Sequence, residues 1–290
     1  MNLLITGAWQ QAPQYISKIE LMGHQVLFLQ QEKDPLPCEP DWIEGVICNG
    51  LFLHHPIESF SNLKYIQLTS AGTDRVDTAY IQSHNIELHT ARGVYSIPMA
   101  ESALAGVLSL YRGLPGFQKN QQTHTWEKNR NLRELNGQNV LILGCGSVGT
   151  ECAKRFKAFG CKVIGIDLFP REDVNYDKIF PLTELDNLLP QGNILLLTLP
   201  LTEETRGLIN QNRLNLIHGI LVNIARGKII DTKALESWDG EAILDVFEEE
   251  PLPQNSPFWN KEDFIIMPHN SFVSNETADR LSKTIINFLK

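Results

Sequence analysis

The chain has 290 residues, 42% of them hydrophobic and 20% charged, which suits a soluble globular protein with one or two full cores. Its net charge of −9 argues against a nucleic-acid partner, because proteins that bind polyanions usually carry a basic surplus. No apolar run approaches the ~18 residues of a membrane helix, and the start lacks the cationic region of a signal peptide, so no membrane partner is expected. The 5 cysteines form no C-x-x-C pair, which argues against a zinc site and predicts a reducing, cytoplasmic location.

Short apolar runs alternate with longer mixed segments, which is the rhythm of β-α-β units and a parallel sheet. An early set of strands is expected at Leu3–Thr6, Val26–Leu29, Gly45–Cys48, Tyr65–Leu68 and Ile86–His89. A later set is expected at Asn139–Leu143, Lys162–Ile166, Ile194–Leu199, Gly219–Ile224, Ala242–Val246 and Phe264–Met267. The later strands are the more apolar, as is typical of strands covered by helices on both faces.

A long helix is expected between the two sets, from Pro98 to about Arg112. Proline suits the first position of a helix, because its missing N–H would have no partner there. A polar stretch follows from Gln118 to Asn136, and we expect Trp126 within it to anchor the loop by packing. A final helix is expected over Ser274–Lys290.

A glycine-rich turn, Gly144–Gly149 (GCGSVG), lies between an expected strand and an expected helix. This is the context that a dinucleotide-binding G-x-G-x-x-G motif requires. Gly144 permits the tight turn, Gly146 lets a pyrophosphate approach the backbone, and Gly149 lets helix and strand pack closely. The N–H groups and the positive end of the helix dipole would then face the phosphates. Cys145 within the turn is interpreted as a small packed residue, with a reactive thiol as the alternative.

The next strand ends at Asp167, 18 residues after Gly149. A carboxylate at this point accepts hydrogen bonds from the ribose hydroxyls and repels a 2′-phosphate, which favours NAD over NADP as the cofactor. Arg171 follows closely in the sequence and would soften that preference.

Polar residues also follow the last three expected strands, and ligands bind beyond the carboxyl ends of strands in an open α/β sheet. Arg226, Glu248–Glu250 and His269 occupy these places. Each has an ordinary interpretation by itself, as a salt-bridged arginine, a solvated acidic patch or a structural histidine. Together they supply what reduction of a 2-keto acid requires: a cation for the carboxylate and carbonyl, a proton donor, and a carboxylate that holds the donor charged.

In these motifs the chain resembles the D-isomer-specific 2-hydroxyacid dehydrogenases. The matching stretches are Leu63–Asp77, Ser96–Glu101, Leu135–Gly149, Leu199–Thr205, Asn223–Gly227, Leu244–Pro251 and Pro268–Asn270. The resemblance implies an α/β fold with two Rossmann-like domains and parallel sheets. A nicotinamide-binding domain at residues 98–271 would be inserted into a flavodoxin-like substrate domain of residues 1–97 and 272–290. It also implies a homodimer formed through the long helix.

The resemblance also implies roles for individual residues. Arg226 would bind the substrate carboxylate and polarise the keto oxygen, His269 would be the acid/base, and Glu250, five positions after Asp245, would be the partner of His269. Backbone N–H groups of Ser70, Ala71 and Gly72 would bind the substrate carboxylate. Asp245 would hold the nicotinamide carboxamide, and the other cofactor contacts would be Gly144, Gly146, Ser147, Val148, Gly149, Asp167, Leu199, Pro200, Thr205, Ile224 and Ala225.

The predicted function is hydride transfer between NAD(H) and a small 2-keto or 2-hydroxy acid of D configuration, with no metal ion. Glu250 argues against a formate dehydrogenase, in which the histidine is expected to lack an acidic partner. Two alternatives stay open: an NAD-sensing regulator or co-repressor without catalysis, and an NADP-preferring glyoxylate/hydroxypyruvate reductase. Retention of Arg226, Glu250 and His269 disfavours the first, and the second depends on Asp167.

Overall fold

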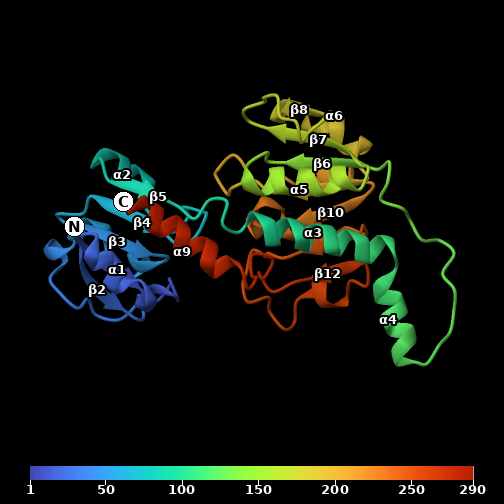
Figure 1. Ribbon diagram of the computed structural model, residues 1–290. Helices are drawn as coiled ribbons and strands as arrows, with labels where there is room; N and C mark the ends of the chain where they lie inside the picture. Colours follow the sequence, from blue (N-terminus) through green and yellow to red (C-terminus); the bar gives the residue numbers. More distant parts are fainter. Residues whose placement is uncertain (290) are drawn as a thin grey trace. The chain divides into compact units, whose positions relative to one another are not determined.

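The computed structural model describes residues 1–289 and divides into two compact units. Unit 1 comprises Met1–Tyr95 and Ser274–Lys290, and unit 2 comprises Ser96–Val273. Each unit is built on one parallel sheet with helices (Figure 1), so the predicted α/β class with two Rossmann-like sheets is confirmed. The predicted domain boundaries lie within two residues of those of the units. Among residues 1–289, no helix has the length and apolar character needed to cross a membrane.

The sheet of unit 1 has the strand order β2-β1-β3-β4-β5, which is the flavodoxin order. Helices α1 and α9 cover one face with Ile19, Leu281 and Ile285, and α2 covers the other with Ile81. The strands are β1 (Asn2–Thr6), β2 (Gln25–Leu29), β3 (Gly45–Cys48), β4 (Tyr65–Leu68) and β5 (Glu87–His89), and the helices are α1 (Ile16–Leu21), α2 (Thr78–Ser83) and α9 (Thr277–Phe288). Short 3-10 helices lie at Ala12–Gln14, Pro40–Trp42, Leu51–Leu53 and Ile57–Ser59.

A single carboxylate ties the carboxyl ends of β1 and β3 together. Glu32 Oε1 accepts hydrogen bonds from Thr6 Oγ1 at 2.8 Å and from Asn49 N at 2.7 Å. Its Oε2 accepts one from Gly50 N at 2.7 Å. In this strand order a ligand site is expected between β1 and β3, where the order reverses. In this protein the chain's own carboxylate occupies the backbone donors at that point.

The sheet of unit 2 has the order β12-β11-β10-β9-β6-β7-β8, which is the Rossmann order extended by one strand. Its strands are β6 (Asn139–Leu143), β7 (Lys162–Asp167), β8 (Lys178–Pro181), β9 (Ile194–Leu197), β10 (Ile220–Asn223), β11 (Ala242–Leu244) and β12 (Phe264–Ile266). The helices are α3 (Ser96–Tyr111), α4 (Leu114–Gln122), α5 (Ser147–Ala158), α6 (Leu185–Leu188), α7 (Gln211–Leu214) and α8 (Thr232–Ser237). Short 3-10 helices lie at Leu182–Glu184, Leu189–Gln191, Gly227–Ile229 and Pro257–Asn260.

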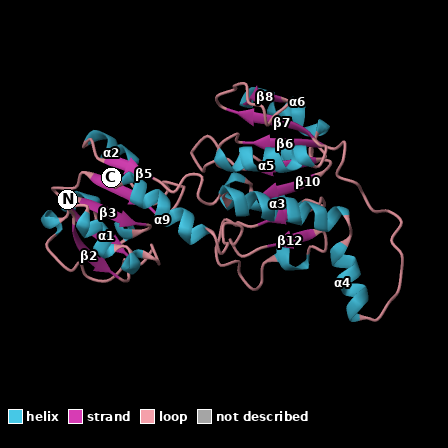
Figure 2. Ribbon diagram, viewed as in Figure 1, coloured by secondary structure: helices cyan, strands magenta, loops and turns pink. Residues whose placement is uncertain are grey.

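Two hydrophobic cores lie on opposite faces of this sheet. Helices α3 and α5 pack on one face with Val107 and Phe156, and α6, α7 and α8 pack on the other with Leu188, Leu214 and Leu235. Figure 2 shows α3 and α5 lying over the sheet and running roughly along its strands. Because both faces are covered, the central strands β9 and β10 are fully buried, and all of their residues except Asn223 are apolar.

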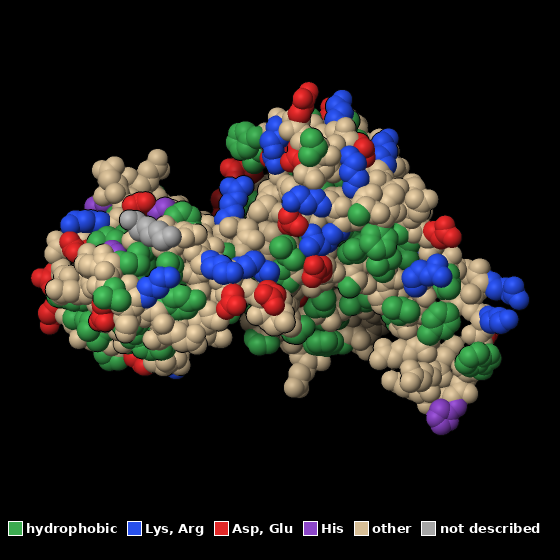
Figure 3. Space-filling view, in the orientation of Figure 1, with side chains coloured by type: hydrophobic (Ala, Val, Ile, Leu, Met, Phe, Trp, Pro, Cys, Tyr) green, Lys and Arg blue, Asp and Glu red, His purple; other side chains and the backbone are tan. Residues whose placement is uncertain are grey.

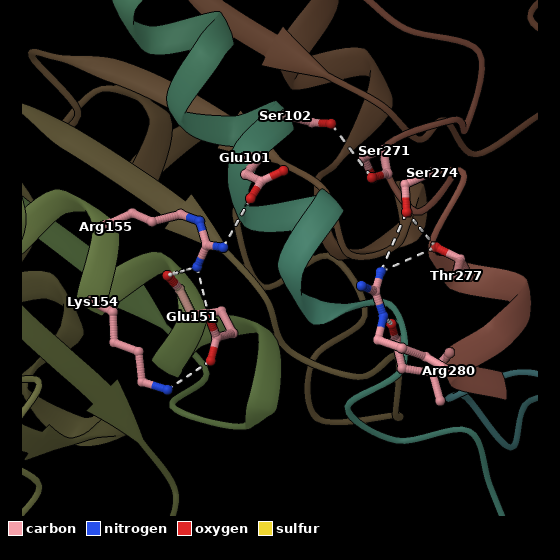
Figure 4. Close-up of polar contacts among 10 residues, drawn as sticks. Glu101, Ser102, Glu151, Lys154, Arg155, Ser271, Ser274, Thr277 and Arg280 are labelled. Carbon is pink, nitrogen blue, oxygen red and sulfur yellow. Dashed lines mark hydrogen bonds and ion pairs between the residues drawn. The ribbon is translucent and has the colours of Figure 1, made fainter. Parts of the chain in front are cut away.

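Ion pairs join α3 to α5 at their exposed edge. Arg155 on α5 pairs with Glu101 on α3 at 3.0 Å and with Glu151 on its own helix at 2.6 Å (Figure 4). Lys154 also pairs with Glu151, at 2.7 Å. Burial alone would raise the pKa of Glu151, but its hydrogen bonds to these two cations, together with their charges, outweigh burial and lower the pKa overall. The network fixes the helix that begins at the glycine turn against the long helix.

Beyond α3 the chain leaves the core as an arm, defined here as α4 and residues 123–132. No residue of α4 is buried, and every residue from 121 to 131 is exposed. The prediction that Trp126 packs its loop is wrong, since its side chain is 98% exposed. Figure 1 shows the reason, because the arm extends away from the sheet and its cores. The chain rejoins the unit at Arg133, whose guanidinium bonds Glu241 at 2.6 and 2.7 Å and covers the ring of Tyr111.

Candidate functional site

The glycine turn has one open position and two closed ones. Gly144 has φ +99°, and a methyl group there would lie 2.8 Å from Leu199 N. A methyl group at Gly149 would lie 2.2 Å from Gly144 O, so helix α5 needs glycine there to pack against the turn. A methyl group at Gly146 would meet nothing within 4 Å. The side of the turn at Gly146 therefore has room for a ligand, as a pyrophosphate cradle requires.

The same turn opens helix α5, which begins at Ser147 with no side-chain cap on its first N–H groups. Ser147 and Val148 are half-buried in this first turn. N–H groups and the dipole at the start of a helix attract anions. The residues present therefore fit the phosphates of a dinucleotide.

Two charged side chains converge on Cys145 in the middle of the turn. Asp167, the last residue of β7, accepts hydrogen bonds from Cys145 N at 2.6 Å and from Phe169 N at 3.0 Å. Arg171 donates to the Cys145 carbonyl oxygen. Burial raises the pKa of the Cys145 thiol to about 12, which supports its interpretation as a packed small residue.

The segment after β9 closes the other side of the turn, and the role of its first residue, Thr198, was not predicted from the sequence. Thr198 Oγ1 donates to Gly144 O at 2.6 Å, so the end of β9 holds the turn in place. Of the predicted cofactor residues nearby, Leu199 is buried, Pro200 is exposed, and Thr205 donates to Pro200 O at 2.7 Å. The sequence signal for Thr198 was a polar residue at the end of the apolar run Ile194–Leu197, directly before the LPLTEET stretch.

Arg226 follows β10 in a turn that Asn223 clamps. The buried Asn223 amide accepts a hydrogen bond from Ala225 N at 3.1 Å and donates one to Arg226 O at 3.0 Å. The Arg226 guanidinium donates to Ala225 O at 2.8 Å, while Ile224 and Ala225 themselves are buried. A role for Asn223 was not predicted from the sequence, although a polar residue at the end of a fully buried strand was a signal.

Gly227 brings the Arg226 turn against the segment that leads to Glu250. A methyl group at Gly227 would lie 1.9 Å from Phe247 C and 2.4 Å from Glu248 N. Only glycine permits so close a backbone approach. The segments after β10 and β11 are therefore in direct backbone contact.

Glu250 and His269 are hydrogen-bonded to each other at the same edge of the sheet. Glu250 Oε2 lies 2.7 Å from His269 Nδ1, and Glu250 Oε1 accepts a hydrogen bond from Phe247 N at 2.9 Å. The side chains of His269 and Glu250 are 40% and 34% exposed, so solvent and ligands reach both. Glu250 is thus held by the main chain on one oxygen and by the imidazole on the other.

Asp245 lies beneath this pair and is 1% exposed. Its carboxylate accepts hydrogen bonds from Asn270 N at 2.7 Å, from Ser271 N at 3.1 Å and from Ser271 Oγ at 2.5 Å. Its backbone N–H bonds Asn223 O at 2.9 Å, and its carbonyl accepts from His269 N at 2.8 Å. The structure therefore brings Arg226, Glu250 and His269 to the ends of three neighbouring strands, with Asp245 linking them.

The predicted substrate residues Ser70, Ala71 and Gly72 lie at the carboxyl end of β4 in unit 1. Ser70 Oγ donates to Gly72 O at 2.9 Å, and Ser70 O accepts from Ala91 N at 2.8 Å. Ala71 is exposed and its two neighbours are partly exposed. The loop is therefore ordered and accessible within its own unit.

The fold and the glycine turn define a nucleotide-binding α/β protein of the Rossmann class. Residues 104–271 match the family model described as D-isomer specific 2-hydroxyacid dehydrogenase, NAD binding domain. The chain is 33% identical over 242 residues to a glyoxylate reductase of Thermofilum pendens, covering 78% of this chain and 71% of that protein. It is 30% identical over 290 residues to a glyoxylate reductase of Korarchaeum cryptofilum, covering 93% and 86%.

A solved structure gives the same result across both units. The D-isomer specific 2-hydroxyacid dehydrogenase family protein of Aeromonas salmonicida has a TM-score of 0.83 and 28% identity, covering 99% of this chain and 94% of that one. This chain belongs to the D-isomer-specific 2-hydroxyacid dehydrogenase family, whose members are oxidoreductases with an NAD(P)-binding domain.

Proposed function

We propose that this protein is an NAD-dependent D-2-hydroxyacid dehydrogenase that interconverts a small 2-keto acid and its 2-hydroxy acid. The observation that carries the proposal is the 2.7 Å contact between His269 Nδ1 and Glu250, at the sheet edge that also carries Arg226. A cation and an acid–base pair at the carboxyl ends of parallel strands suit carbonyl reduction beside a bound cofactor.

The cofactor would lie along the glycine turn and, when bound, supply or accept the hydride. The open side at Gly146 and the start of α5 at Ser147 suit its pyrophosphate. Asp167 at the end of β7 suits a ribose with free hydroxyls, which is why we propose NAD rather than NADP. Further cofactor contacts are proposed for Val148, Gly149, Leu199, Pro200, Thr205, Ile224 and Ala225.

Three side chains would perform the acid–base work. Arg226 would bind the substrate carboxylate and stabilise negative charge on the keto oxygen. Glu250 holds Nδ1 of His269, so Nε2 is the nitrogen that would give a proton to that oxygen during reduction and take it back during oxidation. The substrate-binding role of Ser70, Ala71 and Gly72 stays a prediction.

The test is loss of NADH absorbance with a panel of 2-keto acids, run with the wild type and with His269→Gln. Turnover of a keto acid that falls by about 10²–10⁴-fold in the variant would support the acid/base role. Arg226→Lys should raise KM and lower kcat together, because it keeps the charge and loses the bidentate geometry. NADH binding without turnover of any keto acid would instead support the regulator alternative.

One observation favours a second candidate, an NADP-preferring reductase. Arg171 donates to the Cys145 carbonyl oxygen, which places a guanidinium on the turn beside Asp167. An arginine at this place suits a 2′-phosphate. Comparing kcat/KM for NADH and NADPH in the wild type and in Arg171→Ala decides between the two cofactors. A wild type that prefers NADPH would overturn the NAD assignment.

We also propose a homodimer in which the arm packs against a second copy of this chain. An isolated helix shorter than about 12 residues is marginal in water, and α4 buries none of its 9 residues within the chain. Figure 3 shows hydrophobic and basic side chains together at the surface where α4 lies. Light scattering should show a dimer for the wild type and for the control Trp259→Ala, and a monomer for Trp126→Ala. A monomeric wild type would refute the proposal.

The cytoplasmic location stays a prediction, which cell fractionation would test.

A further inference from the structure

We propose that Asp245 is a positioning residue that fixes the loop Pro268–Ser271 and thereby the imidazole of His269. This inference rests on the proposed acid/base role of His269. It differs from the expectation that Asp245 serves the nicotinamide carboxamide, because it assigns the carboxylate to the protein's own main chain.

The carboxylate of Asp245 is largely occupied by this loop. A carboxylate offers about four acceptor sites. Three donors from Asn270 and Ser271 reach it at 2.5 to 3.1 Å, and the side chain is 1% exposed. A buried charge is stable only when hydrogen bonds satisfy it, so these donors are the counterpart of the carboxylate.

The loop needs such a restraint because of the backbone conformation of His269. His269 has φ +52°, in the left-handed region that residues other than glycine adopt at a cost. Such a conformation persists where the surroundings over-determine it. Here the N–H of His269 bonds the Asp245 carbonyl at 2.8 Å, and the next two N–H groups bond the Asp245 carboxylate. The carbonyl and the carboxylate of one aspartate therefore hold three consecutive N–H groups.

A second contact fixes the end of the loop to the long helix. Ser102 Oγ on α3 donates to Ser271 O at 3.4 Å (Figure 4). Ser271 is then held through its N–H, its hydroxyl and its carbonyl. Glu250 holds the imidazole ring of His269 by the 2.7 Å contact to Nδ1. Asp245 holds the main chain of His269 through its N–H.

The test compares Asp245→Asn with a matched control. The amide keeps the shape of the side chain but turns an N–H group toward donors, which weakens the hold on the loop. We expect kcat to fall about 10–100-fold while the Kd for NADH stays within about threefold. The reason is that a displaced His269 imidazole slows proton transfer in the chemical step without altering cofactor binding. The control Asp231→Asn alters a carboxylate of the same unit that accepts a hydrogen bond from Ala234 N, at 3.1 Å, and should keep wild-type kcat.

A double-mutant cycle shows whether Asp245 acts through His269. If it does, Asp245→Asn should change kcat less than about twofold when His269→Gln is already present. A loss of NADH affinity as large as the loss of kcat, with the same loss in the His269→Gln background, would overturn the proposal and assign Asp245 to the cofactor. If Asp245→Asn does not fold, Ser271→Ala removes only the 2.5 Å contact and enters the same cycle.

A readout without substrate separates this inference from the proposed function. The imidazole NMR signals of His269, assigned from their absence in His269→Gln, should shift or broaden in Asp245→Asn and stay unchanged in Asp231→Asn. Unchanged signals in Asp245→Asn would overturn the positioning role. Full activity of His269→Gln would refute the proposed function and leave the NMR result standing.

Discussion

Replacing Gly146 by alanine separates a turn built for a ligand from a turn built only for the fold. Gly146 has φ −75° and open space where the methyl group of an alanine would lie, whereas a methyl group at Gly149 would lie 2.2 Å from Gly144 O. The two substitutions should therefore have opposite consequences. Gly146→Ala should spare the fold and damage NADH binding, and Gly149→Ala should damage the fold itself.

The magnitudes follow from these surroundings. At Gly146, alanine restricts the unfolded chain, worth about 0.4–1 kcal/mol, and is a poorer N-cap by a similar amount, so stability should change by less than about 1 kcal/mol. At Gly149, overpacking should cost about 1–3 kcal/mol, or roughly 2–12 °C in Tm. A methyl group that displaces a phosphate from one N–H forfeits a charged hydrogen bond of about 1.5–3 kcal/mol, so Gly146→Ala should weaken NADH binding about 10–100-fold.

Thermal unfolding without NADH measures the first effect, and an NADH titration by fluorescence measures the second. Gly116→Ala is the matched control, because a methyl group there also meets nothing within 4 Å and Gly116 lies in the distant helix α4. It should keep wild-type affinity. If folded Gly146→Ala bound NADH within threefold of the wild type, the reasoning that places a pyrophosphate at this turn would be refuted.

Two further predictions concern stability and thiol chemistry. Glu32→Ala should lower the free energy of unfolding by about 2–4 kcal/mol, measured by urea denaturation, because it leaves the Thr6 hydroxyl and two backbone N–H groups without their acceptor. The exposed control Glu20→Ala should do far less, and equal losses would contradict the role of Glu32 in joining β1 to β3. Burial raises the pKa of Cys145 to about 12, and Cys48, Cys152 and Cys161 are buried as well, so a disulfide reagent should label Cys38 alone in the native protein. If the native Cys38→Ser variant took up label, the four buried thiols would be shown to react in the folded protein, contrary to the prediction.

The sequence predicted the strands well where they are buried on both faces. The expected bounds Gly45–Cys48, Tyr65–Leu68 and Asn139–Leu143 match the structure, because a central parallel strand is a continuous apolar run. The edge strand Lys178–Pro181 was missed, since it is short, begins with lysine and ends with proline. The expected strand Ile194–Leu199 ends earlier, at Leu197, because Thr198 turns back to bond Gly144 O.

The candidate site was predictable as a set of residue types but not as a set of contacts. Strand order places Arg226 and His269 at one edge of the sheet with β11 between their strands, because the carboxyl ends of parallel strands share an edge. Which polar group bonds which main-chain donor depends on the loop conformations. Asp245 shows the difference, since the sequence suggests a cofactor ligand and the structure shows a carboxylate bonded to Asn270 and Ser271. The prediction that Trp126 packs its loop was wrong for a related reason, because no local sequence pattern reveals that the arm leaves the core.

The spacing within LDVFEEEP follows from these contacts. Asp245 must lie at the strand end to bond the loop of His269, and Glu250 must lie where its two oxygens reach Phe247 N and His269 Nδ1. A single inserted residue between the two acids would leave the Asp245 tether intact and move Glu250 away from the imidazole. A group that transfers a proton works best when its surroundings fix it before the substrate arrives. In this protein the main chain of two neighbouring strand ends does that fixing, so the separation between the two acids matters more than the number of acidic residues in the run.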